Sequence, residues 1–359
     1  MFFGPSALLA LPQNPQVTHG QIDLSTQAGR MQIQQLSQMG VINWEDFSIG
    51  AGEWVDIQQL NVDAALLNRV TGAKPSDLLG QLNANGRVYV VNPNGVLVGP
   101  GARINTAEFI ASTLDIADAD FLNGGSLQFE GESDAGIVDL GEITASNGDI
   151  ILVAQVVENA GELEAAEGTV ALGAGQKILL QPDADQRLVI ETSLSDTVAG
   201  IGVDDSGLIE AAQAEIQAAG GSVYDLAINQ SGTIRATGVT QKDGRVLLTA
   251  DGGDLQLSGQ LSAQNADGSG GEILLGGEYQ GSDPAVANAA NVFVTETGQL
   301  DVSAQGDADA GRVIVWSDVQ TDFHGNIDGQ GGASGGDGAF VEVSGRQILN
   351  YYGQADLRA

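Results

Sequence analysis

Carboxylate side chains are the most abundant reactive groups of this chain, and their spacing decides which chemistry they could perform. The 359 residues contain 47 Asp and Glu, 13 Lys and Arg and 2 His. A glycosidase needs converging carboxylates, and a polysaccharide lyase needs carboxylates for calcium beside a Lys or Arg base. The acidic residues, as at Asp204-Asp205 or at Asp307 and Asp309, are placed in Gly-, Ala- and Asp-rich loops without a spacing that selects a pair. Solvated turns explain them better than an active site.

Other catalytic and metal-binding groups are scarce in the sequence. His19 and His324 are far apart, which argues against a histidine metal site or a Ser-His-Asp relay. The absence of Cys excludes disulfides, thiolate zinc sites and cysteine nucleophiles. Glycine pairs such as Gly252-Gly253 lack the strand-to-helix context of a phosphate loop. The sequence therefore predicts a protein that is not an enzyme, with no catalytic residue, metal or cofactor.

The net charge of −34 limits the partners that the chain can have. Binding to nucleic acid or to an anionic membrane through a general electrostatic field requires clustered Lys and Arg, so neither is expected. No apolar stretch reaches the length of a membrane-spanning helix. Residues 1–15 begin with an apolar segment that lacks a basic start, and we interpret them as the remnant of a signal peptide or an N-terminal strand.

Two short patterns recur along the chain and indicate its architecture. The first, Gly-x-(Ile/Leu)-x-(Ala/Val), starts at Gly141, Gly161, Gly207, Gly232, Gly259 and Gly298, with looser copies at Gly325 and Gly353. The second, Gly-x-(Val/Ile)-x-(Leu/Val), starts at Gly148, Gly168, Gly221, Gly244, Gly271, Gly311 and Gly338. These β-branched, alternating segments bounded by Gly, Asn and Asp are typical of strands joined by turns.

The spacing of the repeats predicts an all-β parallel β-helix, a solenoid in which each coil pairs with its neighbours. Most copies are 20 to 28 residues apart, and the gaps of 46 residues after Gly161 and 39 after Gly259 are interpreted as two turns each. The chain would then contain about 13 to 15 coils. Leu261 and Ala263 are expected to point inward, and the glycines to supply positive φ at the corners. An antiparallel sandwich is the less favoured alternative.

The most specific segment is Asn92-Pro93-Asn94-Gly95-Val96. Pro93 fixes φ at the second position of a tight turn, the Asn92 side chain can bond its own downstream amides, and Gly95 accepts the fourth position. The turn is expected to join two buried strands, residues 88–91 and 96–98. A second motif precedes it, Asn68-Arg69-Val70-Thr71-Gly72.

Together with residues 42–50, 105–106 and 111–116, these motifs resemble the haemagglutination-activity, or two-partner secretion, domain of filamentous-haemagglutinin-like exoproteins. The similarity is closer to the high-molecular-weight adhesin branch, and it is strong from Gln16 to about Leu180. Members of this family fold as right-handed parallel β-helices with an N-terminal cap and short extra-helical strands. The resemblance implies the same fold here, in agreement with the repeats.

The resemblance also implies a function and a partner. The domain would be recognised by a cognate outer-membrane transporter through its periplasmic domains, and the exoprotein would be secreted through the periplasm of a Gram-negative bacterium to the cell surface. There it would act as an adhesin for a host or bacterial surface receptor. The family's second Asn-Pro motif is missing near residues 59–65, which leaves a second recognition turn in doubt.

The role of residues 92–96 and the division of the chain remain open at this level. The turn is needed either for folding alone or for direct contact with the transporter. Residues 16–190 are expected to form the secretion domain and residues 191–359 the continuing coils of the exoprotein, a fragment of a longer rod. Two alternatives remain, a β-helical carbohydrate-active enzyme (lyase or glycosidase) and the N-terminal part of a contact-dependent toxin-delivery protein.

Overall fold

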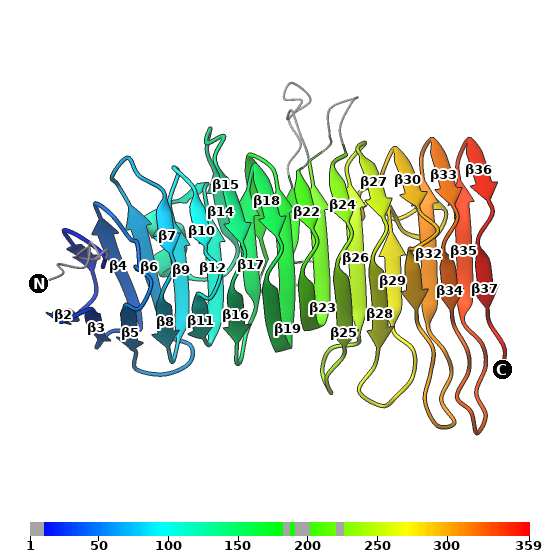
Figure 1. The fold of residues 1–359 in the computed structure, drawn as a ribbon, viewed down its shortest axis with the longest axis horizontal. Coiled ribbons are helices and arrows are strands. Elements are labelled where there is room, and N and C mark those ends of the chain that lie inside the picture. The colour runs from blue at the N-terminus through cyan, green and yellow to red at the C-terminus, as the bar shows by residue number, and fades with distance from the viewer. Residues whose placement is uncertain (1–10, 182–186, 191–201, 220–225) are drawn as a thin grey trace, which may run out of the picture.

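Parallel pairing between successive coils organises the chain. The computed structural model describes residues 11–181, 187–190, 202–219 and 226–359, and it winds them into the parallel β-helix that the repeats predict (Figure 1). The first and last described residues lie at opposite ends of the rod (Figure 1). Among the described residues, no helix has the length and apolar character that a bilayer crossing requires.

Each coil carries three strands, which we assign to three faces of the rod. One coil runs from β15 (Gly136–Asp139) through β16 (Glu142–Ala145) to β17 (Ile150–Ala154). In this coil β16 lies on the first face, β17 on the second and β15 on the third, which is the ten-stranded sheet. It contains β7 (Ser76–Leu78), β10 (Val96–Val98), β15, β18 (Val156–Asn159), β22 (Val203–Asp205), β24 (Ile228–Gln230), β27 (Asp254–Leu257), β30 (Asn291–Val294), β33 (Gln320–Phe323) and β36 (Ile348–Tyr351).

The first and second faces belong to one large sheet, because two long strands, β19 (Glu162–Ala174) and β23 (Leu208–Ala218), bend from one face to the other. The first face consists of β5 (Trp54–Gln58), β8 (Gln81–Ala84), β11 (Arg103–Thr106), β16, the starts of β19 and β23, β25 (Thr233–Thr237), β28 (Gln260–Gln264), β31 (Gln299–Asp301), β34 (Asn326–Asp328) and β37 (Gln354–Asp356). The second face consists of β4 (Met39–Trp44), β6 (Ala65–Val70), β9 (Arg87–Val91), β12 (Glu108–Ser112), β17, the ends of β19 and β23, β26 (Arg245–Ala250), β29 (Glu272–Leu275), β32 (Arg312–Ser317) and β35 (Phe340–Gly345).

The two sequence patterns map onto these faces. The first pattern forms strands of the first face, where Leu261 and Ala263 are buried as predicted. The second pattern forms strands of the second face, except that residues 213–218 occupy that place in one coil. The copy predicted at residues 221–225 lies outside the described residues. In the last copy, Phe340 pairs with Arg312, so the strand enters the sheet one position later than the pattern suggests.

Close stacking, and not positive φ, explains the glycines that start the patterns. A Cβ added to Gly232 would lie 2.3 Å from the carbonyl oxygen of Gly207, and one added to Gly259 would lie 2.0 Å from the oxygen of Gly232. Neither glycine is among those with positive φ. The prediction of positive φ at these corners was therefore wrong: each glycine is required because its backbone rests on the glycine of the preceding coil.

The predicted number of coils was also wrong. Asn159 pairs directly with Asp205, and Leu257 pairs directly with Val294, so each long gap is a single coil with an inserted excursion. The described ten-stranded sheet accordingly supplies one strand to each of ten coils. An excursion that leaves and returns at one corner adds residues without changing the pairing on either side, which the spacing of repeats alone cannot distinguish from a full turn.

Antiparallel strands cap the N-terminal end of the rod. β2 (Ile22–Gln27) forms a hairpin with β3 (Arg30–Gln35), which pairs in parallel with β5. β1 (Gln16–His19) pairs antiparallel with β4. Leu11 is buried in the main core, whereas residues 1–10 of the predicted signal remnant lie outside the described residues. Such a cap protects an open sheet end from pairing with other chains.

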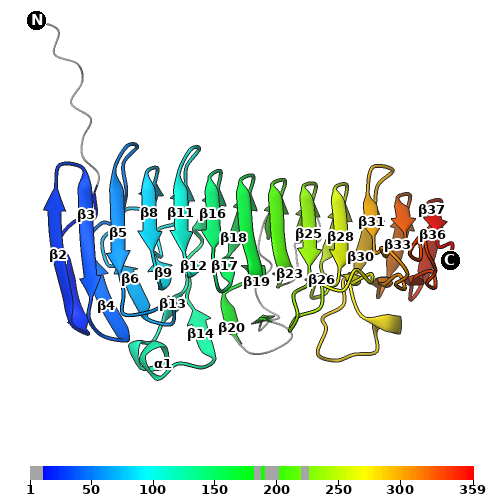
Figure 2. The same ribbon diagram turned by 90° about the horizontal axis from the view of Figure 1, so that it is seen from below.

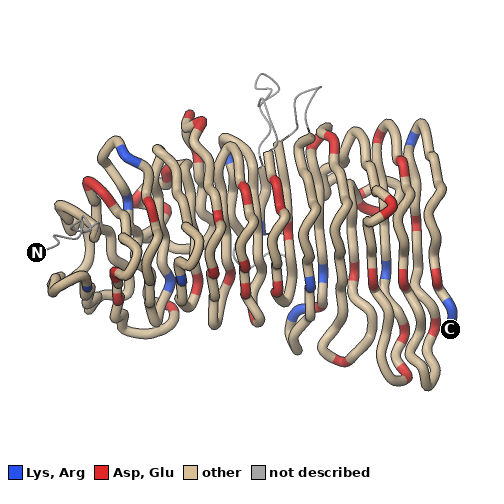
Figure 3. The backbone as a smooth tube through the Cα atoms, viewed as in Figure 1, with Lys and Arg blue, Asp and Glu red and all other residues tan. Residues whose placement is uncertain are grey.

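Three excursions pack outside the rod against the second face, and the first two share one cover (Figure 2). β13 (Asp115–Ile116), α1 (Asp118–Asn123), β14 (Leu127–Glu130), β20 (Lys177–Leu180) and β21 (Leu188–Ile190) form the first cover, whose four strands pair antiparallel. Phe121 and Phe129 anchor it in a second apolar core. A later loop containing η1 (Tyr279–Gly281) places Val286 against Trp316 in a third core. Figure 3 shows acidic residues along the whole rod and few basic ones.

Candidate functional site

The turn at residues 92–95 connects β9 on the second face to β10 on the third. The Gly95 amide donates to the Asn92 carbonyl oxygen at 3.1 Å, which closes the four-residue turn. The Asn92 Oδ1 atom accepts from the Asn94 amide at 2.9 Å, as predicted from the sequence. Gly95 has φ of 113°, a conformation that side chains disfavour. Val96 then enters β10 with its side chain buried. The turn therefore joins two buried strands.

Asn92 also ties this turn to the corner of the preceding coil. Its side chain is fully buried, and its Nδ2 donates to the carbonyl oxygen of Lys74 and to the hydroxyl of Ser76, each at 3.0 Å. Asn94 Nδ2 donates to the Gly72 carbonyl oxygen at 2.9 Å. We call residues 72–76 and 92–95 together the asparagine corner. Every polar atom of the Asn92 side chain is used inside it.

The second predicted motif leads into the same corner and is structural at each position. The Asn68 side chain is buried and accepts from the Trp44 indole at 3.1 Å. Val70 is in the main core, and the Thr71 hydroxyl donates to the Trp44 carbonyl oxygen at 3.0 Å. A Cβ on Gly72 would lie 1.9 Å from the carbonyl oxygen of Glu45, so only glycine fits there.

Arg69 fastens the first extra-helical cover to the rod. Its guanidinium donates to Asp115 at 2.9 Å, and it also contacts Asp118 and the carbonyl oxygen of Ile116. Its side chain is only 14% exposed. The structure thus brings the two sequence motifs together. Residues 68–72 lead from the first coils into the asparagine corner, and residues 92–96 close it.

Only part of the asparagine corner is available to a partner. Pro93 is exposed, Asn94 is half-buried, and the Lys74 side chain is 79% exposed with its ammonium 3.8 Å from Asp46. The side chains of Asn92, Gly95 and Ser76 face the interior or have no atoms to present. A partner that touches this corner therefore meets Ala73, Lys74, Pro75, Pro93 and Asn94.

An interior row of polar side chains shows why carboxylates are present in strands as well as in loops. Asp139, Asn159, Asp205 and Gln230 occupy matching positions of four successive coils and are fully buried. Asn159 Nδ2 donates to Asp205 at 2.7 Å. Burial raises the pKa of Asp139 to about 7 and that of Asp205 to about 6. The assignment of Asp205 to a loop was wrong, because its side chain belongs to this row inside the rod.

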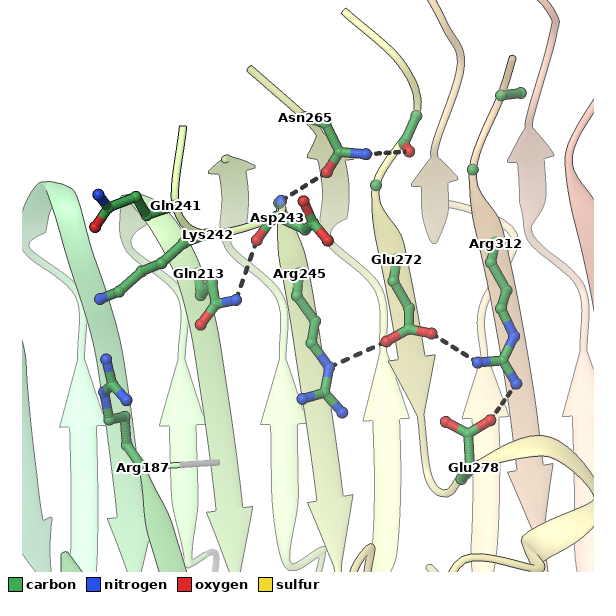
Figure 4. A pocket seen from close by; sticks show the side chains of 15 residues that line it. Arg187, Gln213, Gln241, Lys242, Asp243, Arg245, Asn265, Glu272, Glu278 and Arg312 are labelled. Carbon is green, nitrogen blue, oxygen red and sulfur yellow. Dashed lines mark hydrogen bonds and ion pairs between the residues drawn. The ribbon is translucent and has the colours of Figure 1, made fainter. Parts of the chain in front are cut away.

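An outward row on the second face escaped the sequence analysis. Gln213, Arg245, Glu272 and Arg312 are partners in register on four adjacent strands. A signal was available, since three of these residues directly follow the glycine of the second pattern and alternate in charge. Figure 4 shows them along one hollow of the surface. In the described ranges, no group of three or more His, Asp or Glu is placed to hold a metal ion.

Comparison with known proteins identifies relatives of this arrangement. The family model described as TPS secretion domain matches residues 9–263. A heme/hemopexin-binding protein of Haemophilus influenzae strain Rd is 32% identical over 258 residues, covering 69% of this chain and 28% of that protein. A second heme/hemopexin-binding protein of Haemophilus influenzae is 30% identical over 287 residues, covering 71% of this chain and 30% of that protein. The chain thus spans less than a third of the length of these relatives.

A solved structure has the same coil arrangement. The crystal structure of the HMW1 secretion domain from Haemophilus influenzae superposes with a TM-score of 0.69 at 27% sequence identity. The alignment covers 96% of this chain and 100% of that one.

Proposed function

This chain belongs to the TPS secretion domain family, and on that premise we propose that its first coils carry the export address of a large surface exoprotein. Two-partner secretion domains are recognised by a cognate outer-membrane transporter, and their exoproteins leave Gram-negative bacteria through the periplasm. The family is one of secretion domains and not of enzymes. We further propose that the transporter reads the address through its periplasmic domains and that the exported protein is a surface adhesin.

Two features of the first coils support an export address there. The asparagine corner presents Pro93, Asn94 and Lys74 on a scaffold fixed by Asn92. Within the described part of the chain, β2 is paired along one edge only, by β3. A strand of the partner could add to the free edge through main-chain hydrogen bonds. We place residues 16–190 in the secretion domain and residues 191–359 in the continuing rod, although the coils stack without a break across this boundary.

The names of the two curated relatives favour a second candidate for the exported protein. Both are described as heme/hemopexin-binding. Capture of a heme-carrying protein is therefore an alternative to adhesion for the complete exoprotein. Either activity would depend on the same export step, so the function proposed for the asparagine corner does not depend on this choice.

The decisive experiment separates contact from folding. The chain is co-expressed with its transporter, and the amount exported to the medium is measured for Pro93→Ala and Lys74→Ala. Neither side chain accepts or donates a side-chain hydrogen bond within the corner, so Lys74→Ala should leave refolding and stability unchanged. Pro93→Ala should lower the free energy of unfolding by no more than about 1 kcal/mol, through the greater freedom of the unfolded chain. Reduced export would then support direct recognition.

Asn92→Ala and Asn265→Ala form a matched pair that tests whether a loss of folding stability alone reduces export. Asn265 locks a turn in a later coil, where its Nδ2 donates to Ser269 at 3.0 Å and to the Gly270 carbonyl oxygen at 2.9 Å. If the first coils carry the address, Asn92→Ala should reduce export more than Asn265→Ala at equal loss of stability. Equal export by all four variants would contradict the proposal.

A further inference from the structure

A polar groove runs across several coils, far along the rod from the asparagine corner. It has a volume of about 980 Å³ and follows the corner at which the chain passes from the first face to the second (Figure 4). Gln213, Lys242, Arg245, Glu272, Glu278 and Arg312 contribute side chains to it. Except for Arg187, its lining residues come from the continuing rod beyond residue 190, and none belongs to the asparagine corner, so the export address proposed there does not account for it.

The groove repeats with the period of the coils. Gln213 pairs with Arg245, Arg245 with Glu272, and Glu272 with Arg312. Neighbouring parallel strands are about 4.8 Å apart, so one planar polar side chain follows another at that interval. This interval is close to the length of one sugar unit, and a linear oligosaccharide laid along the row would place successive units beside successive coils.

The charges of the row are already paired with one another. Arg245 Nε is 3.1 Å from a Glu272 oxygen, and Arg312 donates to the other Glu272 oxygen at 2.7 Å. Arg312 also contacts Glu278. The side chains are held in place but partly exposed, 29% for Glu272 and 33% for Arg312. Fixed donors and acceptors without excess charge suit hydroxyl groups better than a strongly charged ligand.

One edge of the groove adds further polar groups from turns (Figure 4). Lys242 lies 3.7 Å from the buried carboxylate of Asp149, which holds its charge beside the start of the row. Gln213 Nε2 donates to the Asp243 carbonyl oxygen at 3.1 Å. At the same peptide, the Asn265 side chain accepts from the Gly244 amide at 2.9 Å (Figure 4). The polar groups therefore belong to a braced surface and not to freely moving side chains.

An exposed aromatic pair continues the row at its C-terminal end. Phe340 is the partner of Arg312 on the next strand and is 53% exposed. Tyr279 is 39% exposed, and its ring centroid is 5.8 Å from that of Phe340, with an angle of 57° between the rings. Their exposed faces can stack on apolar faces of a ligand.

The loop that carries Tyr279 is built with local strain. Gln280 has φ of 56°, in the left-handed region that few residues other than glycine adopt. Its amide donates to Glu342 at 3.1 Å, while Gly281 lies so close to the Trp316 ring that a Cβ would be 2.3 Å from the indole nitrogen. Strained backbone of this kind persists where the surrounding structure over-determines it, and it often marks a functional site.

We propose that this groove binds an uncharged linear oligosaccharide, with the polar row bonding its hydroxyl groups and the Tyr279–Phe340 pair stacking on one sugar ring. The net charge of −34 disfavours a polyanionic glycan. The cations of the groove are already paired with carboxylates, so they do not attract a polyanionic glycan. The ligand class therefore follows from the chemistry of the row, its period and its aromatic end.

Binding of neutral hexasaccharides tests the proposal with the purified 359-residue chain. Hexasaccharides of glucose, N-acetylglucosamine, galactose and mannose, with a heparin hexasaccharide as the acidic probe, are titrated by calorimetry up to millimolar concentration. We expect saturable binding of at least one neutral probe. Tyr279→Ala and Gln213→Ala should each weaken it, the tyrosine variant by at least about tenfold.

Two further variants control for folding and for non-specific stacking. Tyr279→Phe keeps the ring and should retain binding within about threefold, since the phenol contributes only one hydrogen bond. Tyr352→Ala removes a more exposed aromatic, 70% accessible, outside the groove and should have no effect. Binding of the heparin probe alone, equal binding by Tyr279→Ala and Tyr352→Ala, or no saturable binding of any neutral probe would overturn the proposal.

Discussion

Replacement of Asn92 is the perturbation that best tests the account of the asparagine corner. The side chain donates two hydrogen bonds, to the Lys74 carbonyl oxygen and the Ser76 hydroxyl, each at 3.0 Å. It accepts two more from Asn94, both at 2.9 Å. A net hydrogen bond stabilises a protein by about 1 kcal/mol, and a buried partner left unsatisfied costs about 1–3 kcal/mol.

The burial of each partner gives the expected magnitude. Ser76 is fully buried, so its hydroxyl loses a partner that water cannot replace. Asn94 is half-buried, so its two donors can turn to solvent. Asn92→Ala should therefore lower the free energy of unfolding by about 3 kcal/mol, and Asn94→Ala by about 1 kcal/mol.

Asn92→Asp sharpens the test because it keeps the shape of the side chain. The carboxylate retains the acceptor for Asn94 but cannot donate to the Lys74 carbonyl oxygen, and it buries a charge. At neutral pH this variant should be less stable than Asn92→Ala, and the difference should shrink at acidic pH as the carboxyl becomes protonated.

Urea unfolding followed by tryptophan fluorescence measures these differences. Trp44 and Trp54 lie in the first coils, whereas Trp316 lies in a late one. The Trp316→Phe background leaves only the two tryptophans of the first coils, and the Trp44→Phe, Trp54→Phe background leaves only Trp316, so the two regions can be followed separately. A loss for Asn94→Ala equal to or larger than that for Asn92→Ala would refute the assignment of Asn92 as the buried anchor.

Four other substitutions, one of them a control, test the packing of the rod. Gly72→Ala should prevent the first coils from closing, because the new Cβ would lie 1.9 Å from a backbone oxygen, whereas Gly131→Ala, with 3.7 Å to its nearest neighbour, should be tolerated; circular dichroism and urea unfolding distinguish the two. Burial raises the pKa of Asp139 to about 7, so its stabilising contribution is complete below its ordinary pKa of 3.8 and is lost as the pH rises toward 7. Between those pH values, the free energy of unfolding of Asp139→Asn should fall by up to about 4 kcal/mol less than that of the unmodified chain. An unchanged pH profile would show that the group does not titrate there. Trp316→Ala should release the loop that covers it at a cost of about 3–5 kcal/mol, visible as faster proteolysis near Val286, with a protease-resistant loop as the contrary result.

The coil strands and the main turn could be predicted from the sequence because the fold enforces them at every repeat. Gly232 and Gly259 recur since each stacks on the glycine of the preceding coil, and the residues that follow alternate between the core and solvent. The turn at residues 92–95 was predictable since Pro93 and Gly95 restrict the backbone locally. These features depend on contacts between near neighbours in sequence or between identical positions of adjacent coils.

The excursions and the outward polar groove could not be predicted in the same way. β20 and β21 lie outside the rod in the long gap between two copies of the first pattern, and nothing in the repeat spacing distinguishes that gap from another coil. Arg245, Glu272 and Arg312 are separated by 27 and 40 residues, so their common place after the glycine of the second pattern is the one sequence signal that they are neighbours, and the register shows that they are. The groove forms only where these strands align in register. The sequence patterns predict the strands, but they constrain the outward residues less than the buried ones.

The position of the asparagine corner explains why its folding and export roles are difficult to separate. Its bonds reach back to Lys74 and Ser76 in the preceding coil, and the Asn92 amide donates to the Ser112 carbonyl oxygen of the following one. The Ser133 hydroxyl donates to the Pro93 carbonyl oxygen at 2.6 Å. Ser133 follows β14, so this bond also links the turn to the segment that returns from the first extra-helical cover. In a solenoid, each coil is stabilised only by its neighbours, so damage here uncouples the capped first coils from the rest of the rod. Loss of export in an Asn92 variant would follow from either role, and only a change confined to an outward side chain isolates recognition.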